Sequence, residues 1–229
     1  MGNKEYELWE RWGGEQSDKS VHLGAHTSYK WCNSRRKILF TAASYKFAMK
    51  MIGNIYDPGE KEILELGCND GFGTHFIAEA AKKVIAVDFD EEAIQSAMRN
   101  SCDQNVEYKN EDFLGKKYGE FDGIVSFDVI EHIYPENEGK FMDTVLMNLK
   151  QGGTFVIGCP SQEHQQYSAE CIKKSHVNTY MGEDFYAMLK KYFYNVYLFT
   201  QNDEYIHTGH LRMANSLVAV CSNKKCIDE

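Results

Sequence analysis

The sequence lacks the features that mark a membrane, secreted or disordered protein. It has only 3 prolines and no run of 18 apolar residues, so neither a disordered chain nor a membrane span is expected. Its 7 cysteines are odd in number and scattered, with no Cys-x-x-Cys pair, which favours free thiols over a disulfide framework or a zinc site. The first residues show no basic segment followed by an apolar one, so we expect no signal peptide and a cytoplasmic protein.

Positive charge is also scarce. Lys and Arg number 25 against 34 Asp and Glu, which gives a formal net charge of −9. An acidic chain lacks the overall electrostatic footprint of a duplex-binding protein, so neither a nucleic acid nor a membrane is expected as a partner, although a small local basic patch stays open. The 229 residues are enough for one large domain, or for one domain with an appendage.

Short apolar runs alternate with helical patterns along most of the chain. The first ~33 residues read as irregular and polar, and a helix over about 35–52 is followed by a turn at 57–59. Strands are expected near 63–66, 84–87, 106–108, 124–127, 154–157, 195–199 and 216–221, and helices near 72–81, 91–100, 138–149 and 182–192. The alternation predicts an α/β fold with a doubly wound, mainly parallel sheet, and the last two strands, which have no helix between them, predict an antiparallel last strand.

Residues 63–73 carry the most informative pattern, a strand followed by a glycine-rich turn and a helix start. Such a turn lets a ligand approach the backbone at the carboxyl end of the strand, and the amides at the helix start favour negative groups. The next strand ends at Asp88, 21 residues after Gly67, where a carboxylate can accept hydrogen bonds from both hydroxyls of a ribose. Together these features predict an adenosine-containing cofactor; the alternative is a turn that merely links strand to helix.

The spacing of the glycines selects among adenosine cofactors. A dinucleotide fingerprint would need glycine at positions 67, 69 and 72, but Asn69 and Phe72 stand at two of them, and the chain has no Walker-type loop. The pattern Glu65-x-Gly67-x-x-x-Gly71 instead resembles the first motif of class I S-adenosylmethionine-dependent methyltransferases. Asn69 departs from that family's usual glycine, but Asn tolerates left-handed backbone angles better than most residues.

Three further motifs of this family follow in the right order, at residues 111–113, 121–133 and 149–157. The resemblance, to a bacterial and small-molecule type of this family, implies a Rossmann-like seven-stranded sheet, S-adenosylmethionine as cofactor and S-adenosylhomocysteine as product. It implies that Asp112 reaches the adenine amino group and that Phe113 packs on the adenine ring. The full set of expected cofactor contacts is Tyr29, Glu65, Gly67, Cys68, Asn69, Asp70, Gly71, Asp88, Phe89, Asp112, Phe113, Phe127, Asp128 and His132.

Methyl transfer to a hydroxyl or ammonium needs a group that takes the proton. His132 follows the fourth strand, beside the cofactor's methyl group in this fold, and His176 lies in the segment after the fifth strand; we expect both to be catalytic. The alternative is that Glu131 and His132 only hold their loop together. Asp128, Glu131 and His132 are also of types that bind Mg²⁺ or Zn²⁺, but acids at a helix start explain the same pattern, so no metal is expected.

The remaining expectations concern organisation and substrate. Residues 1–57 are expected to form an N-terminal lid and helix packed on the core, with Tyr29 touching the cofactor, and residues 58–229 the methyltransferase domain, with an insertion at 160–181 as the wall of the acceptor pocket. Polar side chains in the insertion favour a small polar acceptor, such as a sugar, a sugar nucleotide or an amino-alcohol phosphate in surface polysaccharide biosynthesis, and a quinone precursor stays open as well. The alternatives are a protein or RNA methyltransferase and a non-catalytic cofactor-binding module. A monomer or a homodimer is expected.

Overall fold

The computed structural model describes residues 3–15, 22–53 and 60–226, and its centre is an eight-stranded sheet in the order β3-β2-β1-β4-β5-β8-β6-β7. The strands are β1 (Glu62–Leu66), β2 (Lys83–Asp88), β3 (Val106–Asn110), β4 (Phe121–Phe127), β5 (Leu149–Pro160), β6 (Phe193–Asn202), β7 (Tyr205–His207) and β8 (Ser216–Lys224). The first five strands are parallel, and β8 runs antiparallel between β5 and β6. The predicted doubly wound sheet with an antiparallel last strand is therefore confirmed. The short β7, which pairs with β6 at one edge, is a strand beyond the seven expected.

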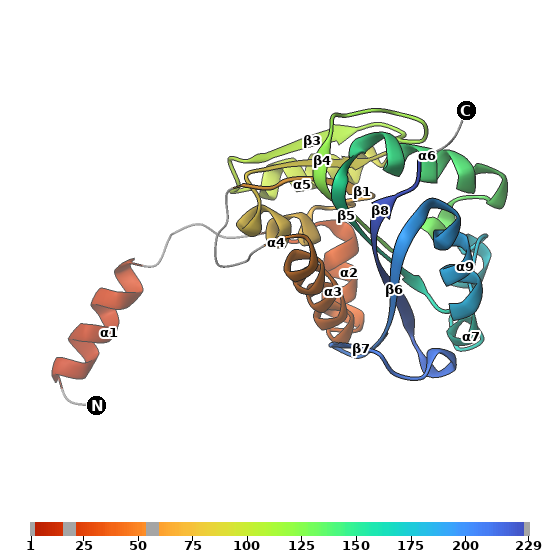
Figure 1. Ribbon diagram of the computed structural model, residues 1–229. Helices are drawn as coiled ribbons and strands as arrows, with labels where there is room; N and C mark the ends of the chain where they lie inside the picture. The colour runs from red at the N-terminus through yellow and green to blue at the C-terminus, as the bar shows by residue number, and fades with distance from the viewer. Residues whose placement is uncertain (1–2, 16–21, 54–59, 227–229) are drawn as a thin grey trace.

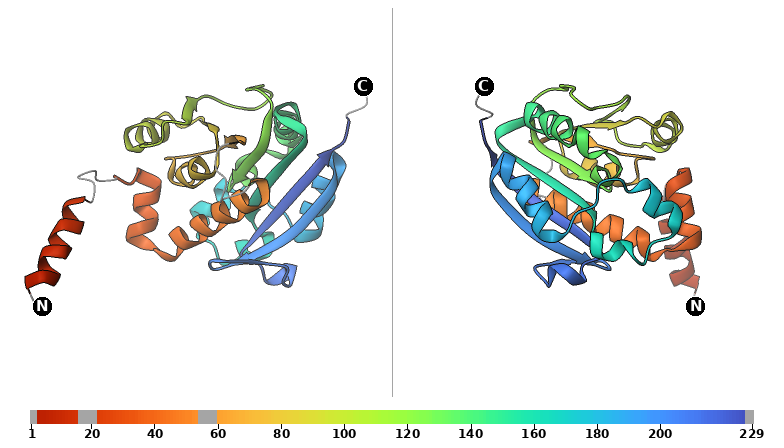
Figure 2. Two further views of the ribbon diagram at one scale, coloured as in Figure 1. Left: turned by 60° about the vertical axis from the view of Figure 1, so that its left-hand side comes forward. Right: turned by 90° about the vertical axis from the view of Figure 1, so that its right-hand side faces the viewer.

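Helices cover both faces of the sheet (Figures 1 and 2). The helices in the described part of the chain are α1 (Asn3–Glu15), which lies apart from the sheet in Figure 1, and α2 (Ala25–Asn33), α3 (Arg36–Ile52), α4 (Phe72–Ala80), α5 (Glu91–Asn100), α6 (Glu138–Asn148), α7 (Gln162–Gln165), α8 (Glu170–Ser175) and α9 (Gly182–Tyr192). One hydrophobic cluster joins α3, α4 and α5 to one face, and a second joins α6 and α9 to the other. None of the helices in the described part of the chain is long and apolar enough to cross a membrane.

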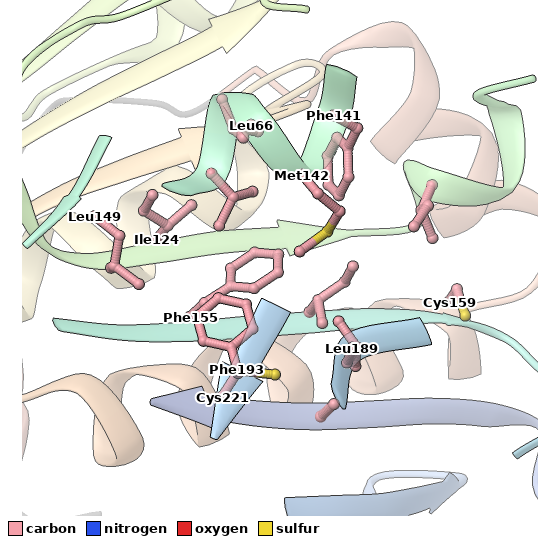
Figure 3. Packing of buried hydrophobic residues seen from close by; sticks show 14 of the residues in the cluster. Leu66, Ile124, Phe141, Met142, Leu149, Phe155, Cys159, Leu189, Phe193 and Cys221 are labelled. Carbon is pink, nitrogen blue, oxygen red and sulfur yellow. The ribbon is translucent and has the colours of Figure 1, made fainter. Parts of the chain in front are cut away.

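Along a strand, successive side chains pack alternately into the two hydrophobic clusters. In β1, Ile63 faces the cluster of α3 and α4, whereas Leu64 and Leu66 face that of α6 and α9. Figure 3 shows the second cluster, in which the rings of Phe155 and Phe193 stack with centroids 6.0 Å apart. Strands buried on both faces are almost entirely apolar because neither face meets water, and this burial supplies most of the driving force for folding.

The N-terminal region differs from its prediction as irregular chain, because α1 and α2 are helical. Helix α2 packs against α3, and Figure 1 shows α1 to one side of the body. One amide in the first turn of α2, that of Thr27, donates to an acceptor from a distant part of the chain, described below, and the residue before the helix, Gly24, offers no capping side chain. The expected turn at 57–59 and the expected domain boundary at 57/58 lie outside the described residues.

Candidate functional site

The glycine turn joins β1 to α4 through three residues in the left-handed region of backbone space. Gly67, Asn69 and Gly71 have φ of 82°, 48° and 79°. The side-chain oxygen of Asn69 accepts the amide of Asp70 at 2.7 Å, and this bond supports the left-handed angle without glycine. The turn is fastened to the neighbouring strand because the amides of Gly67 and Cys68 both donate to the carbonyl of Val87. Backbone groups are thus presented at the carboxyl end of β1, as the sequence pattern predicted.

Asp88 stands at the end of β2, directly beside this turn. Its Oδ2 accepts the amide of Asn69 at 2.8 Å and its Oδ1 accepts the amide of Asp90 at 3.0 Å, and the residue is 7% exposed. Each carboxylate oxygen has a second lone pair, so the group retains capacity for two hydroxyl donors. The next side chain, Phe89, is 75% exposed. A fixed carboxylate followed by an open aromatic ring suits a ribose carrying an adenine.

Glu65 lies behind the turn, in the core. Its oxygens accept hydrogen bonds of 2.6 Å from the hydroxyls of Tyr45 in α3 and Thr74 in α4. Burial raises the pKa of Glu65 to about 7, and the two hydroxyl donors oppose that shift. Its carboxylate therefore links the two helices to β1. Cys68, also expected at the cofactor, turns its thiol into the same core, where burial raises the thiol pKa.

Tyr45 supports the turn and was missed by the sequence analysis, which expected only a helix over about 35–52 in this region. Its ring lies over Gly73, where an added Cβ would come within 1.9 Å of the ring carbon Cζ. The ring also meets Phe127 edge-on, with centroids 5.2 Å apart. Helix α3 therefore holds both the start of α4 and the end of β4 in place.

The N-terminal segment contacts the turn through Asp70. The carboxylate of Asp70 accepts two hydrogen bonds from Thr27, one from its main-chain amide at 2.8 Å and one from its hydroxyl at 2.7 Å. Both residues are buried. Gly24 fits so closely that an added Cβ would lie 2.3 Å from the Cβ of Asp70. Tyr29, which the sequence analysis expects to touch the cofactor, is 65% exposed, and the contact of this segment with the turn is made by Thr27.

The segment after β3 lies beside Asp88, because the amide of Glu111 donates to the Asp88 carbonyl at 2.9 Å. Asp112 is exposed, and its carboxylate accepts the amide of Leu114 at 3.0 Å. Phe113 is buried and meets Phe141 edge-on, with centroids 6.2 Å apart. The ring that the resemblance assigned to the adenine is therefore part of the core in this structure, and Phe89, which follows Asp88 in the chain, is an exposed ring.

The end of β4 leads into a cluster of ionisable side chains. Asp128 is exposed and has φ of 56°, a sparsely populated angle for a residue other than glycine. Glu131, three residues on, is 1% exposed, and neither of its carboxylate oxygens has a hydrogen-bond partner among the described residues. Burial, with the charge of Asp128, raises the pKa of Glu131 well above its usual range.

The two expected catalytic histidines meet beside Glu131. The rings of His132 and His176 are 5.0 Å apart between centroids and nearly perpendicular. Nδ1 of His132 lies 3.0 Å from the carbonyl of Ser175, to which it can donate, and Nε2 lies 4.0 Å from Oε1 of Glu131. Burial and the neighbouring His132 lower the pKa of His176. The structure thus joins residues 44 positions apart, a pairing that the sequence alone did not predict.

The two ends of the segment after β5, which carries His176, are joined to each other by backbone contacts. Ser161 and Tyr180 form a parallel bridge, and the amide of Gln162 donates to the Tyr180 carbonyl at 2.9 Å. The amide of Asn178 donates to the carbonyl of Glu131 at 3.1 Å, which fixes this segment, with α7 and α8, against the end of β4. The insertion therefore lies beside the carboxyl ends of β4 and β5.

Comparison with known proteins agrees with this geometry. Residues 63–153 match the family described as "Methyltransferase domain". A probable S-adenosylmethionine-dependent methyltransferase of Mycolicibacterium smegmatis is 28% identical over 102 residues, which are 44% of this chain and 39% of that protein. A ribosomal RNA small subunit methyltransferase A of Mesomycoplasma hyopneumoniae is 25% identical over 148 residues, 65% of this chain and 56% of the other. A ubiquinone biosynthesis O-methyltransferase of a Caulobacter species is 29% identical over 100 residues, 42% of this chain and 39% of the other.

The fold has well-matched counterparts among solved structures. An S-adenosylmethionine-dependent methyltransferase from Clostridium acetobutylicum superposes with a TM-score of 0.65 at 15% identity, over 86% of this chain and 96% of the other. The chain spans about two fifths of the length of the first curated relatives it matches. Residues 63–153 are therefore similar to a methyltransferase domain, in agreement with the resemblance that the motifs carry, and the chain shares its fold with an S-adenosylmethionine-dependent methyltransferase of known structure.

Proposed function

We propose that this chain binds S-adenosylmethionine along the carboxyl ends of β1, β2 and β4 and methylates an oxygen or nitrogen of a small polar metabolite. The cofactor, when bound, supplies a methyl group on a sulfonium leaving group. Asp88 holds the ribose hydroxyls, the amides of the glycine turn approach the methionine part, and Phe89 packs on the adenine. The observation that supports this arrangement is the pairing of Asp88 with the left-handed Asn69 at adjoining strand ends.

The acceptor is placed by the insertion and by the histidine pair beside it. The side chains that the insertion offers are polar and exposed or half-exposed: Gln162, Glu163, His164, Gln165, Gln166, Tyr167 and Ser168. They suit a sugar, a sugar nucleotide or an amino-alcohol phosphate better than an apolar ring. His132 donates through Nδ1, so the lone pair of Nε2 is available to take a proton from the acceptor. His176 is the second candidate for that role.

A methyl-transfer screen tests this function. Purified protein is incubated with S-adenosylmethionine labelled in its methyl group and with sugar nucleotides, phosphorylated amino alcohols and structured RNA in separate reactions. Label in a small-molecule fraction is the expected result, and its loss in His132→Ala with cofactor affinity kept would place His132 at the acceptor. Label in none of the small molecules but in RNA would overturn the proposed acceptor class.

RNA is the second candidate acceptor because of one comparison. The ribosomal RNA methyltransferase of Mesomycoplasma hyopneumoniae aligns with 65% of this chain, a larger share than the 44% and 42% of the other two relatives. The net charge of −9 weighs against it, since phosphate contacts dominate affinity for RNA. The RNA arm of the same screen decides between the two classes.

A further inference from the structure

We propose that Glu131, His132 and His176 form a binding site for a divalent transition-metal cation, with open coordination positions for an oxygen of the acceptor. Each of the three side chains offers one ligand atom, and these atoms lie within 4.8 Å of one another. Binding of the cation can be tested in the absence of any acceptor. The role assigned to the open positions rests on the proposed methyltransferase function.

The burial of Glu131 is the observation that points to a ligand. An ordinary buried carboxylate is hydrogen-bonded, because desolvating it without a partner is costly. Glu131 is 1% exposed, and both of its oxygens lack a partner among the described residues. By contrast, Glu65, which is equally buried, has a hydroxyl donor on each oxygen. A cation bound between Glu131 and the histidines would supply the missing partner.

The histidines are oriented as ligands by the groups behind them. A ligating histidine usually donates its other ring N–H to a carbonyl or carboxylate, which fixes the tautomer. His132 meets this requirement, since Nδ1 lies 3.0 Å from the Ser175 carbonyl and Nε2 faces Glu131. His176 meets it through Gln165, whose amide nitrogen Nε2 contacts Nδ1 and whose Oε1 has no partner among the described residues. Turning that amide by 180° places Oε1 against Nδ1–H and leaves Nε2 free to bind.

The donor set decides the class of metal. Two imidazole nitrogens and one carboxylate suit Zn²⁺, Mn²⁺ or Fe²⁺ better than Ca²⁺ or Mg²⁺, which prefer oxygen ligands. Three protein ligands leave positions open, as in catalytic rather than structural sites. A hydroxyl of the acceptor bound there would have a lowered pKa and would release its proton to water before methyl transfer. In that case His132 acts as a ligand and the role of proton acceptor passes to solvent.

Metal binding to the full chain tests the proposal without an acceptor. The protein is treated with chelator, dialysed and titrated with Mn²⁺ by electron paramagnetic resonance and with Zn²⁺ by calorimetry. We expect one site per chain, weakened at least about tenfold in Glu131→Gln, His132→Ala and His176→Ala. The matched control is His164→Ala, a half-exposed histidine of the same insertion outside the cluster, which should bind as the wild type does. Absence of binding, or binding that these three substitutions leave unchanged, would overturn the proposal.

Thermal unfolding supplies a second readout, which separates a ligand from a structural residue. With chelator present, Glu131→Gln should unfold no earlier than the wild type, because the two side chains have the same shape and neither oxygen of Glu131 has a hydrogen bond to lose among the described residues. Added Zn²⁺ should raise the melting temperature of the wild type and not that of Glu131→Gln. An unchanged wild-type melting temperature would contradict the site. Binding of S-adenosylhomocysteine is measured in parallel. It shows whether the proposed cofactor site is correct, whatever the outcome for the metal site.

Discussion

The carboxylate of Asp70 accepts two hydrogen bonds from Thr27, one from the main-chain amide and one from the hydroxyl. Asp70 belongs to the glycine turn, and Thr27 lies in the first turn of α2, 43 residues earlier. The turn thus caps a helix of the N-terminal segment, a role that a residue next to the helix ordinarily fills. The position of α2 and the geometry of the turn are therefore coupled.

This coupling predicts that α2 detaches when Asp70 loses its charge. Asp70→Asn keeps the shape but turns an amide donor toward Thr27, which should lower the free energy of unfolding by about 1–3 kcal/mol. Hydrogen exchange should accelerate in α2 and remain slow in β1 and β4. Ser28→Ala removes a hydroxyl of the same helix that donates to the Leu23 carbonyl at 3.0 Å in an exposed position, and it serves as the control. Equal protection of α2 in Asp70→Asn and wild type would show that the pair does not hold this helix.

A side chain at Gly67 should destabilise the fold as well as the turn. The residue has φ of 82°, and an added Cβ would lie 2.2 Å from Cγ2 of Val129. Gly67→Ala is expected to cost about 1–3 kcal/mol through backbone strain and crowding. The double variant Gly67→Ala with Val129→Ala removes the crowding and should recover part of that loss in chemical denaturation. Full additivity of the two single changes would contradict the contact.

The buried Glu65 predicts a specific dependence of stability on pH. Its pKa is about 7 in the folded protein against 4.5 when exposed, so the folded state binds the proton more tightly. The stabilisation from protonated Glu65 is present below pH 4.5 and is lost as the pH rises through 7. The change amounts to a few kcal/mol, on the order of 3. Denaturation at several pH values should show Glu65→Gln with a flatter profile over this window; parallel profiles would indicate an ordinary pKa.

Two phenylalanines should separate stability from cofactor binding. Phe113 is buried against Phe141, so Phe113→Leu should lower the free energy of unfolding by about 1–2 kcal/mol and change cofactor affinity little. Phe89 is exposed beside Asp88, so Phe89→Ala should leave stability within about 0.5 kcal/mol of wild type and weaken binding of S-adenosylhomocysteine. If Phe113→Leu weakened cofactor binding and Phe89→Ala did not, the adenine contact would belong to Phe113.

Local patterns in the sequence predicted the sheet and the turn because both depend on nearby residues. The apolar strands, the glycines at 67 and 71 and the acid at 88 each carry their signal within a few positions. Helix α2 could not be predicted in this way, since its cap is Asp70, and the pairing of His132 with His176 depends on how the insertion closes through Ser161 and Tyr180. The side-chain directions of Glu65 and Phe113, which face the core, were likewise not encoded in the spacing of the motifs.

Calorimetry with S-adenosylhomocysteine tests the central proposal, cofactor binding at the glycine turn and Asp88, most directly. We expect wild-type protein to bind at one site and Asp88→Ala, checked for folding by circular dichroism, to bind more weakly by about 2–3 kcal/mol, or roughly 30- to 150-fold. The control is Glu107→Ala, an acid on β3 that pairs with Lys83 and Lys109, which should bind as the wild type does. Absence of binding by the wild-type protein, or an affinity unchanged in Asp88→Ala, would contradict the account.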